Sequence, residues 1–138
     1  MGRELSRPVA ALGVAVMMCA ALGACHKAKL GATAADVAAA QADARKEIDQ
    51  AHAEAKKDMK NAAKLAGADS KDAMLARVTG SFDIAMANAD GTHKVALEQC
   101  MTLPPAEQPP CKDHADADYQ TAAAHAKAMR IAQLHKSS

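Results

Sequence analysis

Residues 100–111 read CMTLPPAEQPPC, and this stretch decides the fold. It places Pro104-Pro105 and Pro109-Pro110 between two long segments that are rich in alanine. Proline has no backbone N–H and its ring clashes with the preceding helical turn, so four prolines this close together interrupt a helix. The stretch therefore predicts the sharpest turn in the chain, with one helix before it and one after it.

The segment before the turn is predicted to be one helix that begins at Asp69 or Ser70 and runs to Leu103. Its apolar side chains follow the spacing that one face of a helix requires. This stripe consists of Leu75, Val78, Phe82, Met86, Ala89, Ala96, Cys100 and Leu103. Gly80 and Gly91 lie inside the segment, and each costs a helix about 1 kcal/mol relative to alanine. We expect a continuous helix that is weak near Gly91, the alternative being a break there.

The segment after the turn is predicted to be a helix from about Lys112 to Leu134. One of its faces carries Cys111, Ala115, Tyr119, Ala122, Ala126 and Met129. The helices on the two sides of the turn are expected to pack antiparallel, as a helical hairpin over about residues 70–135.

A third long helix is predicted upstream of the hairpin, over residues 33–66. Thr33 followed three residues later by Asp36 is typical of a helix start, because both side chains can cap backbone N–H groups. The stretch that follows contains neither glycine nor proline up to Ala66, and Gly67 suits a C-terminal cap. Residues 33–138 are therefore expected to form a single helical domain.

Apolar residues of this upstream helix recur at intervals of eleven. They are Val37, Ile48 and Met59, with Ala44, Ala55, Ala62 and Ala66 between them on the same side. An eleven-residue period corresponds to 3.67 residues per turn, so the stripe runs nearly straight. We interpret it as a packing face, the alternative being a surface for a lipid or a partner. The helix either folds back to make a three-helix bundle or pairs between molecules, and the fold class is all-α in both cases.

Residues 1–24 have the composition of a secretory signal. Arg3 and Arg7 precede an uncharged run from Val9 to Ala24 that ends in small residues. The run is shorter than the ~20 residues that a membrane-spanning helix needs. Residues 1–24 are therefore expected to be removed, which leaves equal numbers of basic and acidic side chains.

The end of that run, Leu22-Gly23-Ala24-Cys25, resembles the lipobox of bacterial lipoproteins. The resemblance implies cleavage before Cys25, acylation of this residue, a tether over residues 25–32, and a chain facing the periplasm of a Gram-negative bacterium. In such lipoproteins an aspartate directly after the acylated cysteine favours retention in the inner membrane. Here that position is His26, which implies sorting to the outer membrane. Two alternatives stay open, namely cleavage after Gly23 to release a soluble secreted protein, and a retained signal anchor.

Cys100 and Cys111 are the two cysteines that remain once the signal is removed and Cys25 is acylated. They flank the proline turn, and an oxidising compartment such as the periplasm favours a disulfide between them. Such a bond would close the hairpin and stabilise it by about 3 kcal/mol in the chain-entropy model. The alternative is a zinc-like metal site in which His93 and His114 join the two thiolates, although this spacing matches no zinc-finger pattern.

The composition excludes several classes of function. The charges alternate along the helices without forming a basic face, so we expect no binding to nucleic acid. One phenylalanine, one tyrosine and no tryptophan leave few side chains to line a large pocket. The chain contains no Gly-x-Ser-x-Gly, His-Glu-x-x-His, glycine-rich phosphate loop or Cys-x-x-Cys motif. We therefore expect neither an enzyme nor a cofactor.

The stretches from Ala89 to Cys100 and from Cys111 to Tyr119 resemble small alanine-rich envelope proteins of proteobacteria. The resemblance covers about residues 82–130 and implies a two-cysteine helical hairpin, without adding any chemistry. We expect a non-enzymatic, lipid-anchored envelope protein with a scaffold or stress-related interaction role. Its expected partners are the membrane, through the anchor, and a second copy of the chain if helix 33–66 pairs between molecules. The alternative function is periplasmic metal binding by histidines, with the cysteines if they are reduced.

Overall fold

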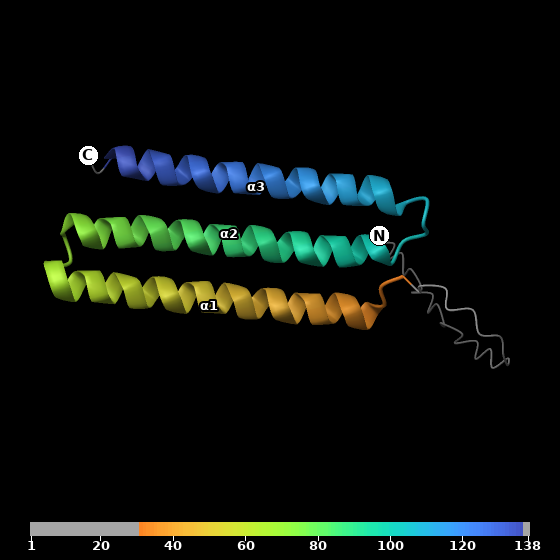
Figure 1. Cartoon of the computed structure of the whole chain (residues 1–138), viewed down its shortest axis with the longest axis horizontal. Helices are drawn as coiled ribbons and strands as arrows, with labels where there is room; N and C mark the ends of the chain where they lie inside the picture. The colour runs from red at the N-terminus through yellow and green to blue at the C-terminus, as the bar shows by residue number, and fades with distance from the viewer. Residues whose placement is uncertain (1–30, 137–138) are drawn as a thin grey trace, which may run out of the picture.

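The computed structural model describes residues 31–136. They form three α-helices, α1 (Ala34–Ala66), α2 (Lys71–Met101) and α3 (Gln108–Lys136), and no strand occurs in this range. The predicted all-α class is therefore confirmed. The helices lie side by side and antiparallel, with α2 in the middle (Figure 1).

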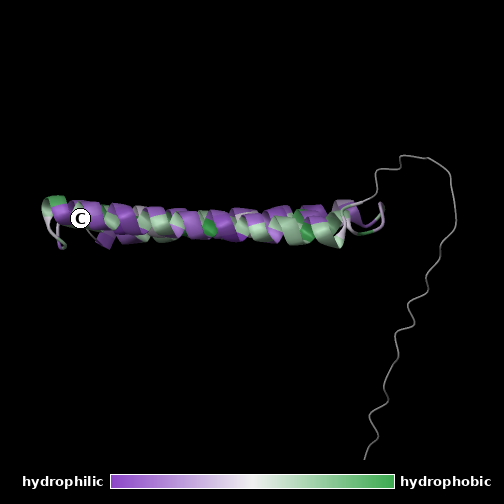
Figure 2. Ribbon diagram, turned by 90° about the horizontal axis from the view of Figure 1, so that it is seen from below, coloured by the Kyte–Doolittle hydropathy of each residue, from purple (hydrophilic) through white to green (hydrophobic). Residues whose placement is uncertain are grey.

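The three helices form an open layer that is one helix thick. α1 packs along one side of α2 and α3 packs along the other, whereas no Cα atom of α1 lies within 8 Å of one in α3. When the molecule is turned by 90°, the layer is seen edge-on and is thin (Figure 2). α1 thus folds back onto the hairpin, but the three helices share no common central core.

Local capping sets the ends of α1 and the start of α2. The Thr33 hydroxyl accepts a hydrogen bond from the Asp36 backbone N–H (3.3 Å), and the Asp36 carboxylate accepts one from the Thr33 N–H (2.7 Å). These hydrogen bonds lower the pKa of Asp36. Gly67 ends α1 at φ 90°, a conformation that costs glycine little, and the Ser70 hydroxyl caps α2 by accepting from the Ala73 N–H (3.1 Å). The predicted ends at Thr33, Gly67 and Ser70 are confirmed.

Gly80 and Gly91 do not interrupt α2, which is one continuous helix. Both are buried contact points for α1. A Cβ atom on Gly80 would come 2.7 Å from the Cβ of Ala55, and one on Gly91 would come 2.9 Å from the Cβ of Ala44. The same eleven-residue interval separates the two glycines and the two alanines, so the antiparallel register repeats once along the interface.

The opposite side of α2 packs against α3. Three members of the predicted α2 stripe, Val78, Ala89 and Cys100, are buried there. The buried apolar residues of the described chain are Ala44, Ala55, Ala73, Val78, Ala89, Cys100, Ala115, Ala123 and Ala126. All but two of these are alanine, so the interior consists of two narrow seams of small side chains. Such seams bury little apolar area per residue.

The start of α3 differs from the prediction. The helix begins at Gln108 and not near Lys112, so Pro109 and Pro110 lie in its first turn. The N–H groups of a first turn have no acceptor within the helix, and proline is therefore tolerated there. The Gln108 side chain donates a hydrogen bond to the carbonyl of Leu103 (2.9 Å), which ties the start of α3 to the end of α2.

Candidate functional site

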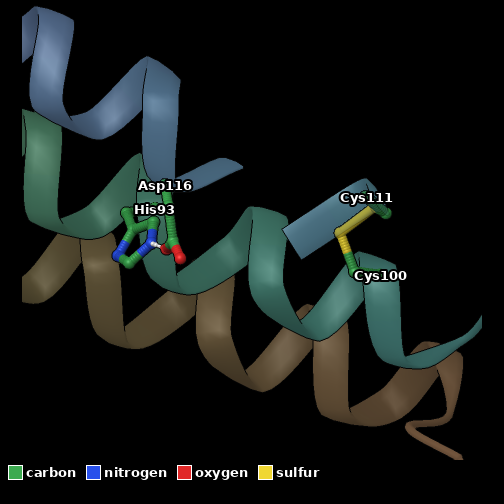
Figure 3. A network of polar contacts seen from close by, with 4 residues as sticks. All are labelled: His93, Cys100, Cys111 and Asp116. Atoms are coloured by element: carbon green, nitrogen blue, oxygen red, sulfur yellow. Dashed lines mark hydrogen bonds and ion pairs between the residues drawn. A yellow bond between two sulfur atoms is a disulfide. The ribbon is translucent and has the colours of Figure 1, made fainter. Parts of the chain in front are cut away.

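The two predicted cysteines meet where α2 ends and α3 begins. The sulfur atoms of Cys100 and Cys111 are at bonding distance, 1.90 Å, and their Cα atoms are 5.6 Å apart. Cys100 is almost fully buried, at 1% exposure. The pair closes the hairpin across the proline turn. Figure 3 shows the two side chains joining α2 to the start of α3.

A polar cluster lies on the same two helices, seven residues before Cys100 on α2 (Figure 3). His93 of α2 and Asp116 of α3 approach to 2.6 Å between Nε2 and Oδ1. The ring of Tyr119 stacks on His93, with centroids 4.8 Å apart. A hydrogen bond to the Asp90 carboxylate raises the pKa of Tyr119. These contacts join α2 to α3, so the cluster acts as a second tie between the two helices.

The four residues of the metal alternative are not gathered into one site. Cys100 and Cys111 are paired with each other, and His93 is engaged by Asp116. His114 is exposed and lies 3.5 Å from Asp118 of the next helical turn. Within residues 31–136 no group of three or more histidine, cysteine, aspartate or glutamate side chains could hold a metal ion.

The lipidation residue Cys25 and the signal segment lie outside the described residues. The described chain begins at Gly31, next to the backbone carbonyl of Met101 at the end of α2. The chain therefore enters the layer at the end that holds the cysteine pair (Figure 1). None of the helices in the described range is both long and apolar enough to cross a membrane.

The two broad faces of the layer differ in chemistry. On one, which we call the groove face, a shallow groove of about 640 Å³ runs between α2 and α3. It shares Thr92 and Ala96 of α2 with a second groove beside α1, so both grooves open on the same side. On the other, which we call the charged face, Lys94 of α2 pairs with Glu47 of α1 at 2.7 Å. Thr92 and Lys94 point to opposite sides because successive helical residues are rotated by about 100°.

The hydrogen bond to Glu47 on the charged face raises the pKa of Lys94. Both side chains are about half exposed, so this pair contributes modestly to stability.

The contact between His93 and Asp116 was not predicted from the sequence. The cysteine pair could have predicted this contact, because a bond between Cys100 and Cys111 fixes the antiparallel register of α2 against α3. A residue two turns before Cys100 must then lie about level with residues two turns after Cys111. His93, Asp116 and Tyr119 all fall near that level.

Comparison with known proteins finds no match. No protein-family model matches the chain, and no curated protein or solved structure is significantly similar to it.

Proposed function

We propose that the mature protein is a non-enzymatic envelope protein that is held by acylated Cys25 on the periplasmic side of the outer membrane. Its role in this proposal is that of a spacer or scaffold. The observation that carries the proposal is the elongated layer, which the chain enters at one end. A 33-residue helix such as α1 extends about 50 Å. The far end of the layer can therefore stand well away from an anchored first residue.

The interior of the layer supports a structural role. Its buried side chains are apolar and small, and no polar or charged side chain is buried within residues 31–136. Active sites usually hold ionisable groups in protected clefts, where burial tunes their pKa values. The ionisable groups of the described helices lie instead on exposed or half-exposed surfaces, as Lys94 and Glu47 do.

The closed end of the hairpin fits the same role. The end of the layer at which the described chain begins also holds the pair Cys100–Cys111 and, about two turns further in, the contact between His93 and Asp116. Both contacts hold α2 to α3 beside the point where the described chain begins. A disulfide bond between Cys100 and Cys111 is consistent with a periplasmic location, because disulfides persist in that oxidising compartment.

Fatty-acid labelling in a Gram-negative host tests the anchor. The wild-type chain should incorporate labelled palmitate and fractionate with outer membranes, and Cys25→Ser should do neither. Cys19→Ser, which changes a cysteine inside the signal segment, is the matched control and should label normally. Label that persists in Cys25→Ser would overturn the anchoring proposal. Stoichiometric zinc or copper in protein purified from the periplasm would favour the metal-binding alternative.

A further inference from the structure

Within residues 31–136 the groove face has no second layer of structure against it. Folded domains usually bury an apolar helix face against another layer of structure. Here both grooves on this face are open, and the ridge between them is formed by Thr92 and Ala96 of α2. The charged face is different, since its surface between α1 and α2 is lined by ionic residues such as Glu47, Lys94 and Glu98.

At one height along the layer, the two rims of the groove face carry side chains of opposite charge. Arg45 lines the rim on α1, and Asp118 lines the rim on α3. Arg45 makes no ion pair with any residue that the structure describes. Among the described residues, the ion-pair contact of Asp118 is with His114, 3.5 Å away on its own helix.

Arg45 and Asp118 stand at nearly the same height along the layer. The contact of Ala44 with Gly91 fixes the height of α1 against α2, and the pair His93–Asp116 fixes that of α3. Arg45 is one residue after Ala44, and Asp118 is two residues after Asp116. Their positions along the helix axes therefore differ by no more than about one helical turn.

A second pair repeats this arrangement further along the layer. Asp49 lies one turn after Arg45 on α1, and His125 lines the groove on α3. The contact of Arg130 with Phe82, 4.9 Å from the ring centroid, sets the height of this part of α3. By that register Asp49 and His125 are also level. Neither makes an ion pair within the described chain.

We infer that the groove face is covered by a second copy of this chain, related by a two-fold axis that runs parallel to α2. Such an axis preserves height and exchanges the two rims. Arg45 of one copy then meets Asp118 of the other, and Asp49 meets His125. Each pair occurs twice, because a two-fold interface uses the same surface on both copies.

The centre of the groove face satisfies a further condition of this symmetry. Along the axis each residue of α2 faces its own counterpart, so a charge there would meet a like charge. Between Ser81 and Gln99 the groove-face residues of α2 are Ser81, Ala85, Asn88, Thr92, Ala96 and Gln99, and none is charged. The opposite side of α2 carries Asp83, Asp90 and Lys94, so the charged face would repel itself in the same arrangement.

This symmetry keeps both tethers at one end of the dimer. The inference rests on the proposed anchoring only in this step, since two copies with tethers at the same end can share one bilayer. An axis perpendicular to the helices would place the tethers at opposite ends, and would not bring Arg45 to Asp118.

A charge exchange tests the pairing across the interface. In the full chain carrying Cys25→Ser, which separates this test from anchoring, Arg45→Asp and Asp118→Arg should each raise the dimer dissociation constant at least tenfold. The two changes combined should restore it to within about threefold of the parent. Because α1 and α3 do not touch within one chain, the restoration has to come from contact between copies. Lys46→Asp, on the charged face, is the matched control and should leave the constant unchanged.

A cysteine placed on the axis gives an independent readout in intact cells. Thr92→Cys in the full chain should form a disulfide-linked dimer under mild oxidation, with or without Cys25, whereas Asp83→Cys should not. A monomer by sedimentation at all concentrations would overturn the inference. So would a double variant as weak as the single ones, or equal crosslinking of the two cysteine variants.

Discussion

Gly91 of α2 lies against Ala44 of α1 so closely that a methyl group on the glycine would stand 2.9 Å from the alanine Cβ. Real Cβ atoms do not approach one another to that distance, so the glycine is required by the neighbouring helix. The same relation joins Gly80 to Ala55. Two glycines that weaken α2 as an isolated helix therefore allow α1 to pack on it.

Gly80→Ala should destabilise the protein even though alanine is the better helix former. Helix propensity favours the change by about 1 kcal/mol, whereas overpacking typically costs 1–3 kcal/mol, so we expect a net loss on the order of 1 kcal/mol. Thermal unfolding followed by circular dichroism measures it. Combining Gly80→Ala with Ala55→Gly should recover much of the packing loss. Thr79→Ala, at the exposed position next to Gly80, is the control, and a Gly80→Ala variant as stable as that control would contradict the prediction.

Reduction of the Cys100–Cys111 pair should lower the unfolding midpoint markedly. The loop that the bond closes restricts the unfolded chain by about 3 kcal/mol, a large share of the stability available to a core of small side chains. Unfolding in the presence and absence of reductant measures the effect, and Cys100→Ser with Cys111→Ser should match the reduced protein. An unchanged midpoint would mean that packing alone holds the hairpin.

Tyr119 should ionise above its ordinary pKa of 10.0, because its hydroxyl donates to the Asp90 carboxylate. The folded-state pKa is raised, so the contact stabilises the fold below pH 10 and the contribution is lost as the pH rises through the folded-state pKa. Tyr119 is the only tyrosine, so phenolate absorbance reports it directly. Asp90→Asn should move the midpoint down, and an identical midpoint in the two proteins would rule out the contact.

Acid should loosen the start of α1 through Asp36. Its pKa is lowered by hydrogen bonds from Thr33, so the stabilisation is complete above the ordinary value of 3.8 and is lost as the pH falls through the lower folded-state pKa. The protection factor of the first-turn amides of α1, which is the exchange rate of the unfolded chain divided by theirs at the same pH, should therefore fall below about pH 4. Asp36→Asn should show low protection already at neutral pH. A wild-type protection factor that does not change with pH would exclude the role of the carboxylate.

Ile48→Asp should weaken the seam between α1 and α2. Ile48 is half-buried, and its Cδ1 atom would lie 3.6 Å from a Cβ on Gly91. A carboxylate there loses apolar contact and hydration, and we expect a cost of about 2 kcal/mol. Chemical denaturation measures it. Ala53→Asp, exposed on the outer edge of α1, provides the matched control, and equal stability of the two variants would show that Ile48 is not part of the seam.

The sequence by itself determined the local structure, because local chemistry sets it. Thr33 with Asp36 begins α1, Gly67 ends it, Ser70 begins α2, and each acts on backbone groups of its own turn. The sequence also predicted the proline turn between α2 and α3. It did not predict the residue at which α3 begins, because Pro109 and Pro110 fit the first turn of a helix as well as they fit a loop.

Only the tertiary structure decided how the helices meet. The interval of eleven residues predicted a packing stripe on α1, but nothing local matched it to glycines in α2 or placed α3 on the opposite side. The same holds for His93 and Asp116, which lie on different helices and meet through the register set by Cys100 and Cys111. Two helices pack closely where small side chains of both lie opposite each other. Which residues lie opposite depends on the register of the two helices and on the rotation of each about its own axis, and the sequence of one helix alone does not determine either.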